Sequence, residues 1–147
     1  MAHEQFFGVT EQAKAARQRW EDAQVLFGQR RYRGAMYLAG YAVECLLKAK
    51  LMRMFDCRQL RELEDKLRAR KVLRATASIF THQLGLLLHL AQAAHRLRND
   101  PQRWRSFATV NLWIPAWRYN AKPCRPQDAR KYMEAVRTMV HWIEANV

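Results

Sequence analysis

Residues 32–55 read YRGAMYLAGYAVECLLKAKLMRMF, and this stretch decides the fold because it combines helical spacing with very few charges. From Ala35 to Leu47 the only acidic or basic residue is Glu44, and Lys48 follows it one turn later. Apolar side chains fall on more than one helical face, so other helices must cover it on several sides. One row holds Leu38, Ala42, Cys45 and Ala49, and a second holds Met36, Val43 and Leu47. The stretch predicts a buried central helix with one charged pair.

Two glycines and the charged pair in this stretch need a structural reason. Gly34 and Gly40 weaken a helix, so we expect them to allow the close approach of another backbone or of a second subunit. Glu44 and Lys48 have the i,i+4 spacing, in the favourable order, of an intrahelical salt bridge. A carboxylate on a buried helix also needs partners, because an unpaired buried charge is costly. We favour a structural role for this pair over a chemical one.

The rest of the chain also has a helical pattern, with five glycines and four prolines to interrupt it and no strand-like alternation. Besides residues 32–55, we expect helices at residues 10–28, 58–71, 81–97 and from 126 to the end of the chain. Thr10 and Thr81 are the expected N-caps, and Pro126 is the expected first helical residue. Residues 101–126 should hold a short helix near Arg103 and then an extended arm, since Pro115 disfavours a continuous helix.

Length and composition favour one domain, residues 1–147, without a membrane span. A chain of this size can bury about two thirds of its unfolded surface without disulfides or metals. The charge-free run in the central stretch, residues 34–43, is far shorter than the roughly 20 residues that a spanning helix needs. The first ten residues lack a basic stretch followed by an apolar core, so they do not read as a secretory signal. We therefore expect a cytoplasmic protein.

Cysteines and histidines give no sign of a disulfide framework or a metal site. The three cysteines, at positions 45, 57 and 124, are odd in number and show no CxxC spacing. His82 and His89 could share a helix face, but no carboxylate or thiol stands at ligand spacing around them. We expect ordinary thiols, no metal and no other cofactor.

The segment YAVECLLKA, residues 41–49, resembles the second-helix signature of the HEPN family, helical domains named for higher eukaryotes and prokaryotes nucleotide-binding. Further landmarks follow the order of that family, so that the resemblance covers residues 10–147. They are Trp20 with Ala23, Arg31-Tyr32, His82 with Leu84, and Arg118-Tyr119. The resemblance implies an all-α fold, an HEPN-like antiparallel bundle of about five helices.

The resemblance also implies a site and two partners. An arginine of the Arg118-Tyr119 motif is expected to approach the central helix, as a partner for its carboxylate, near a cleft or a subunit interface. Three tyrosines could line the same groove, each with a hydroxyl that needs an acceptor: Tyr37, Tyr41 and Tyr119. Family members commonly form two-fold dimers and are often encoded beside a minimal nucleotidyltransferase that pairs with them as toxin and antitoxin. A homodimer and a nucleotidyltransferase partner are therefore expected.

Charge favours an anionic partner. The chain has 26 basic and 13 acidic residues, a net charge of +13, and 19 of the basic residues are arginines. Residues 96–125 hold seven basic residues, one acid and several aromatic residues, a composition that suits phosphate binding and base stacking. The predicted RNA or nucleotide contacts are Arg96, Arg98, Arg103, Arg105, Arg118 and Tyr119. The alternative is that the tryptophans of this stretch close the core.

Catalysis is a separate question, because the resemblance implies metal-independent ribonucleases with an arginine, four to six intervening residues and a histidine. This chain lacks that spacing: seven residues separate Arg74 from His82, and three separate Arg137 from His141. Arg137 and His141, one helical turn apart, could face one phosphate, and dimerisation could bring His82 near the Arg118 of a second chain. The remaining catalytic candidates are therefore His82, Arg137 and His141.

Three functions stay open. We prefer an HEPN-like RNA- or nucleotide-binding protein, non-catalytic or divergent, and expect the purified protein to leave unstructured RNA intact. The alternative is a toxin-type, metal-independent endoribonuclease of a toxin–antitoxin or defence system. The second alternative is a protein-interaction subunit that does not bind nucleic acid.

Overall fold

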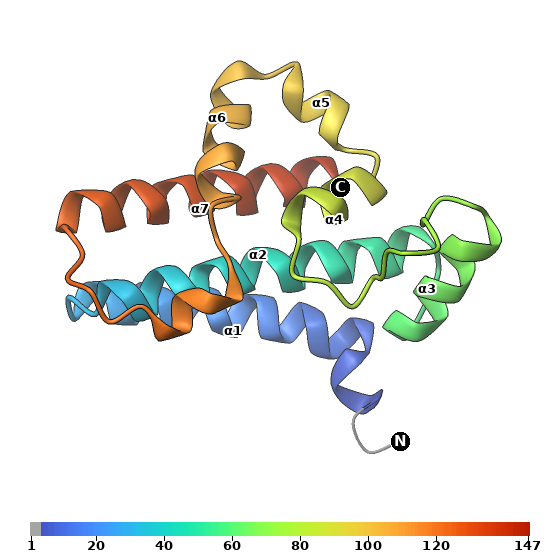
Figure 1. Ribbon diagram of the computed structural model, residues 1–147, viewed down its shortest axis with the longest axis horizontal. Coiled ribbons are helices and arrows are strands. Elements are labelled where there is room, and N and C mark those ends of the chain that lie inside the picture. Colours follow the sequence, from blue (N-terminus) through green and yellow to red (C-terminus); the bar gives the residue numbers. More distant parts are fainter. Residues whose placement is uncertain (1–3) are drawn as a thin grey trace.

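The computed structural model describes residues 4–147, which form helices and loops without a strand (Figure 1). The prediction of an all-α fold is thus confirmed, while the first three residues of the expected domain lie outside the described part. In chain order, with η for 3-10 helices, the elements are η1 (Glu4–Phe7), α1 (Val9–Gly28), α2 (Tyr32–Met54), α3 (Leu60–Ala69), α4 (Leu84–Leu90), α5 (Ala94–Arg98), α6 (Pro101–Val110), η2 (Pro115–Tyr119) and α7 (Pro126–Asn146).

The central helix α2 lies between α1 and α7 (Figure 1). α1 runs antiparallel to α2, whereas α7 runs in the same direction as α2. Fourteen α2 residues between Ala35 and Met52 are buried, which confirms the predicted burial on several faces. Glu44 and Lys48 are among them, and the Lys48 ammonium donates to a Glu44 oxygen at 3.0 Å. The predicted charged pair therefore lies inside the core.

The first helix begins one residue earlier than expected. Its N-cap is Gly8, and Thr10, the predicted cap, lies in the helix with an exposed side chain. Tertiary contacts explain the difference: Gly8 pairs with Gln59 in an isolated bridge, and the Val9 amide donates to the Arg58 carbonyl at 3.0 Å. The chain enters α1 already hydrogen-bonded to the segment before α3, so a capping hydroxyl is not required.

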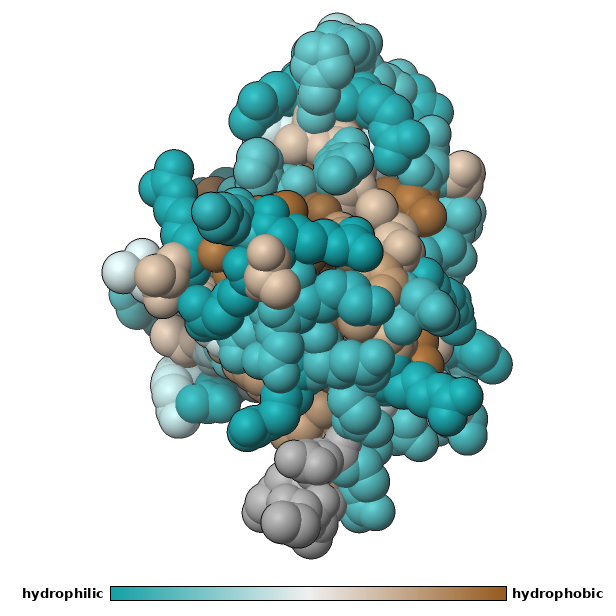
Figure 2. Space-filling model, turned by 90° about the vertical axis from the view of Figure 1, so that its right-hand side faces the viewer, coloured by the Kyte–Doolittle hydropathy of each residue, from teal (hydrophilic) through white to brown (hydrophobic). Residues whose placement is uncertain are grey.

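The third helix matches its predicted pattern but is shorter than residues 58–71. Leu60, Leu63 and Leu67 are fully buried. Of the charged residues between them, Arg61, Glu62 and Asp65 are exposed, whereas Glu64 and Lys66 are partly buried. Figure 2 looks onto the end of the molecule where α3 lies, and that face is mostly hydrophilic. Within the described residues, no helix combines the length and apolar character that crossing a membrane requires.

The prediction of one helix over residues 81–97 is wrong. The segment forms two short helices, α4 and α5, and helix α4 starts at Leu84 rather than near Thr81. The break lies at Gln92, whose backbone is left-handed with φ of 56° while both neighbouring alanines are buried. Because α4 starts only at Leu84, residues 81–83 are not helical, and His82 can turn toward α2.

The stretch after α5 also forms more helix than expected. α6 starts at Pro101, and the Asp100 side chain caps it by accepting from the Arg103 amide at 3.2 Å. A 3-10 helix, η2, follows at Pro115 where an extended arm was predicted. The final helix begins at Pro126 as predicted.

Gly40 confirms the prediction of a close approach to α2, but the approaching group is a side chain rather than a backbone or a subunit. The indole of Trp113 lies directly on Gly40, where a methyl group would overlap the ring. Its Nε1 donates to the Tyr37 carbonyl at 3.0 Å, and the residue is only 3% exposed. At Gly34 the nearest group is the end of the Leu26 side chain, so no such contact occurs there.

The cysteines are free thiols. Cys45 and Cys57 are buried, whereas Cys124 is partly exposed. Burial, with the nearby Glu44 carboxylate, raises the pKa of Cys45 to about 11, so its thiol stays protonated at neutral pH. Cys45 thus behaves as a small buried hydrophobe.

Candidate functional site

Four of the predicted phosphate-binding arginines lie together on α5 and α6, which form a protrusion above α7 (Figure 1). We call Arg96, Arg98, Arg103 and Arg105 the arginine lobe; all four side chains are exposed. The aromatic residues of this stretch do not form an open stacking surface beside them. Phe107 and Trp113 are buried, and the guanidinium of Arg98 covers the Trp104 ring at 5.2 Å.

Each remaining guanidinium of the arginine lobe makes a local contact. Arg96 donates to the Asn146 carbonyl at the end of α7 at 2.7 Å. Arg103 lies 3.7 Å from the Asp100 carboxylate, and Arg105 donates to the Pro101 carbonyl at 3.3 Å. Of these contacts, the one that Arg96 makes caps the end of α7.

Arg118 and Tyr119, the other predicted contacts, lie apart from the lobe on η2, which packs against α2. Tyr119 is 75% exposed, and the Arg118 guanidinium lies 4.9 Å from the centre of its ring. The hydroxyls of Tyr119 and Tyr37 raise the pKa of Arg118, so the guanidinium also lies beside Tyr37 of α2. The predicted set is therefore divided between two surfaces.

His82 lies on the loop before α4, and its ring reaches the buried Glu44 of α2. Its Nδ1 donates to Glu44 Oε1 at 2.6 Å, while Lys48 binds the other carboxylate oxygen. Because an ionised carboxylate only accepts, Nδ1 carries the proton and Nε2 is the acceptor nitrogen of the neutral ring. The His82 side chain is 50% exposed and that of Glu44 is 5% exposed. A solvent-facing imidazole is thus oriented by a buried carboxylate, which is the usual arrangement of a general base.

An aromatic wall connects His82 to the tyrosine beside Arg118. The Tyr41 ring centre lies 5.9 Å from that of His82 and 5.1 Å from that of Tyr37. Trp113 packs edge-on against Tyr41 at 4.8 Å. Burial and the Tyr37 hydroxyl raise the pKa of Tyr41, so that it remains a neutral donor. We call the surface formed by His82, Tyr41, Tyr37 and Arg118, with the buried Trp113 packed beneath it, the His82 groove.

One hollow shares residues with the His82 groove, and a second lies at the start of α2. One, of about 330 Å³, is lined by His82, Trp113 and the loop between α6 and η2. The other, of about 590 Å³, lies where the turn between α1 and α2 meets the loop after η2. Its charged lining residues are all basic: Arg30, Arg31, Arg33 and Lys122. An anionic ligand that lies along this side of α2 therefore meets positive charge at more than one point.

A network on α3 fixes the loop that carries His82, and no sequence pattern indicated it. Glu64 accepts from the Ser78 hydroxyl at 2.6 Å and from the Ile79 amide at 3.1 Å. Arg68 binds Glu64 and donates to three loop carbonyls. Burial raises the pKa of Glu64, but the Ser78 and Ile79 hydrogen bonds and the Arg68 charge outweigh it, so this pKa lies below its ordinary value. The ionised Glu64 carboxylate thus holds the loop in place. These hydrogen bonds weaken as pH falls through the lowered pKa of Glu64 and the carboxylate is protonated.

The other two catalytic candidates, Arg137 and His141, lie elsewhere. Both are exposed on α7, one turn apart as predicted. The Arg137 guanidinium lies 5.9 Å from the ring centre of Trp20 on α1. Arg137 therefore faces α1, whereas His82 faces Tyr41 and Trp113.

Comparison with known proteins gives no relative: the chain matches no family model, no curated protein and no solved structure. The function of this site is therefore inferred from its own geometry.

Proposed function

We propose that the protein is an HEPN-like RNA-binding protein and that it binds single-stranded RNA in the His82 groove. The observation that supports this most is the shared wall of tyrosines that joins an exposed, carboxylate-oriented His82 to the guanidinium of Arg118. On this surface Arg118 supplies a cationic group, Tyr41 a neutral donor and His82 an acceptor. Tyr119 adds an exposed ring. These are the groups that contact phosphate, ribose and unpaired bases.

Each group has a distinct role in this proposal. Arg118 pairs with a phosphate in the bidentate manner of guanidinium groups. The exposed ring of Tyr119 stacks on a base, and His82 accepts a hydrogen bond from a ribose hydroxyl through Nε2. The net charge of +13 contributes a long-range attraction that is independent of sequence.

Arg118→Gln is expected to weaken RNA binding about tenfold and to reduce the slope of log K against log salt concentration by about 0.7, the share of one phosphate contact on a single strand. Fluorescence anisotropy with a short unstructured RNA at several salt concentrations measures both quantities. The control is Arg61→Gln, which removes the same charge from the exposed face of α3.

The control variant should bind as the wild-type protein does, within about twofold at each salt concentration. Equal losses in the two variants would mean that net charge alone binds RNA. A loss on Arg98→Gln but not on Arg118→Gln would assign the contact to the arginine lobe instead. Weak, salt-insensitive binding by the wild-type protein would remove the proposal altogether.

RNA cleavage is the second candidate function, and the short bond between His82 and Glu44 is the observation that favours it. In such a reaction His82 Nε2 takes the proton of the ribose 2′-hydroxyl, whose oxygen attacks the adjacent phosphorus. Arg118 neutralises the charge that develops on the phosphorane, and the 5′-oxygen leaves with a proton from water. The homodimer remains a prediction for either function, and the nucleotidyltransferase partner remains a prediction that belongs to this alternative.

The cleavage hypothesis is tested with excess chelator present, because the proposed step uses no metal. If it is right, RNA fragments end in a 2′,3′-cyclic phosphate, and His82→Ala lowers the rate at least a hundredfold, the usual effect of losing a general base. His141→Ala, an exposed histidine on α7, should leave the rate unchanged. RNA that stays intact with the wild-type protein leaves binding as the function of the groove.

A further inference from the structure

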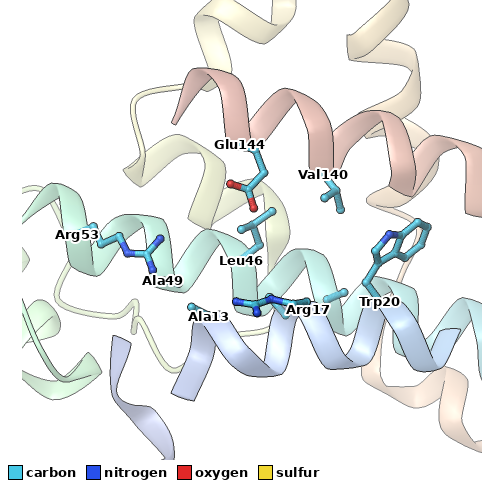
Figure 3. A pocket seen from close by; sticks show the side chains of 10 residues that line it. Ala13, Arg17, Trp20, Leu46, Ala49, Arg53, Val140 and Glu144 are labelled. Carbon is cyan, nitrogen blue, oxygen red and sulfur yellow. The ribbon is translucent and has the colours of Figure 1, made fainter. Parts of the chain in front are cut away.

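A separate pocket, of about 310 Å³, opens between α1, α2 and α7 (Figure 3). It lies on a different face of α2 from the His82 groove, because its α2 residues are Ala42, Leu46, Ala49 and Arg53. Its other lining residues are Ala13, Ala16, Arg17 and Trp20 of α1 and Val140 and Glu144 of α7. The four alanines leave the space between the helices that larger side chains would fill. No feature of the proposed RNA site uses this pocket.

The two ends of the pocket differ in chemistry. Figure 3 shows Trp20 at one end and Arg53 at the other, with Arg17 reaching in from α1 and Glu144 from α7. Val140 lies beside Trp20, and Leu46 lies in the middle of the pocket, next to Glu144 (Figure 3). The pocket therefore offers an apolar, partly aromatic end and a charged end.

The charged end is positive on balance. The Glu144 carboxylate is already paired with the Lys50 ammonium at 3.4 Å. Among the described residues, the ion pairs formed at 4.0 Å or less include neither Arg17 nor Arg53. A third guanidinium, that of Arg137, lies 5.9 Å from the Trp20 ring centre at the other end. An anionic group is the complement of this arrangement.

We propose that this pocket binds a small organic anion with a flat apolar body, a carboxylate or a phosphate monoester. The body packs between Trp20, Leu46 and Val140 over the alanine floor, and the anionic group lies between Arg17 and Arg53. A volume of about 310 Å³ is at the lower end of the range for ligand pockets, which suits a body of one or two fused rings. The carboxylate and the phosphate share this chemistry, and the experiment separates them.

Isothermal titration with three ligands of the same body tests the proposal: 2-naphthoate, 2-naphthyl phosphate and the uncharged 2-naphthalenemethanol. The two anions are expected to bind one to one, and the uncharged alcohol at least tenfold more weakly. The tighter of the two anions identifies the natural anionic group. Because the pocket is separate from the His82 groove, Arg118→Gln should change none of these affinities.

Two variants and one control make the result specific. Arg17→Gln should weaken both anions about tenfold and leave the uncharged alcohol unchanged, whereas Arg61→Gln on α3 should change none of the three. Ala13→Leu fills the pocket from the partly exposed α1 side and should abolish binding, with circular dichroism to show that the variant is folded. Equal binding of the charged and uncharged ligands, or equal losses in Arg17→Gln and Arg61→Gln, would overturn the proposal.

Discussion

Glu44→Ala is expected to lower the free energy of unfolding by about 3–5 kcal/mol, the usual cost of breaking one side of a buried ion pair. Both oxygens of this carboxylate are used, one by Lys48 at 3.0 Å and one by His82 at 2.6 Å. Without it the Lys48 ammonium stays in the core, 7% exposed, with no carboxylate beside it. Urea denaturation followed by circular dichroism measures the change.

The double variant Glu44→Leu, Lys48→Met separates the charge effect from the loss of packing. Because both charges are replaced by apolar groups of similar size, it should be more stable than Glu44→Ala. Asp22→Ala breaks an exposed pair with Arg19 and should cost less than about 1 kcal/mol. A cost for Glu44→Ala as small as that of Asp22→Ala would contradict the buried pair.

Gly40→Ala is the second substitution with a large expected effect, a loss of roughly 3 kcal/mol through overpacking in the core. The added methyl group overlaps the Trp113 indole, which must leave its site and give up its hydrogen bond to Tyr37. Because Trp113 is part of the wall of the His82 groove, RNA binding should fall in parallel. Tryptophan fluorescence and urea denaturation report the displaced ring and the lost stability.

Gly34→Ala is the matched control, since Gly34 lies on the same helix with only the tip of Leu26 within 3.4 Å. There the substitution improves helix propensity without a clash and should be neutral or gain about 0.5 kcal/mol. The two glycines therefore predict effects of different sign. Equal effects at both positions would show that the close contact between Trp113 and Gly40 is not the reason for the glycine.

The sequence predicts the structure best where the deciding interactions join residues that are close in the chain. Glu44 and Lys48 are one helical turn apart, so their pairing follows from helix geometry alone. The start of the final helix at Pro126 follows from the missing amide proton and fixed φ of proline. Burial of residues 35–52 follows from a stretch too apolar to face water.

The partners of His82 could not be predicted in this way. Its bond to Glu44 joins residues 38 positions apart and requires that the chain not be helical before Leu84. That conformation depends on Glu64 and Arg68, whose contacts with the loop have no sequence signature. The one available signal was the buried carboxylate, because its second oxygen needed a donor besides Lys48.

The arginine surface was predicted as one site because its residues are close in sequence. The turn at Asp100 and the Pro115 segment send the chain in different directions, so α5 and α6 form the lobe while η2 reaches α2 (Figure 1). Trp113, one of the aromatic residues in this stretch, is used by the core because Gly40 provides a flat surface for its ring. Composition alone does not distinguish these roles.

The most direct test of the central proposal is nuclear magnetic resonance of the histidine rings during titration with a short single-stranded RNA. The proposal predicts that the His82 ring signals shift and saturate, while those of His95, beside the arginine lobe on α5, stay in place. Saturable shifts at His95 with an unchanged His82 would contradict it.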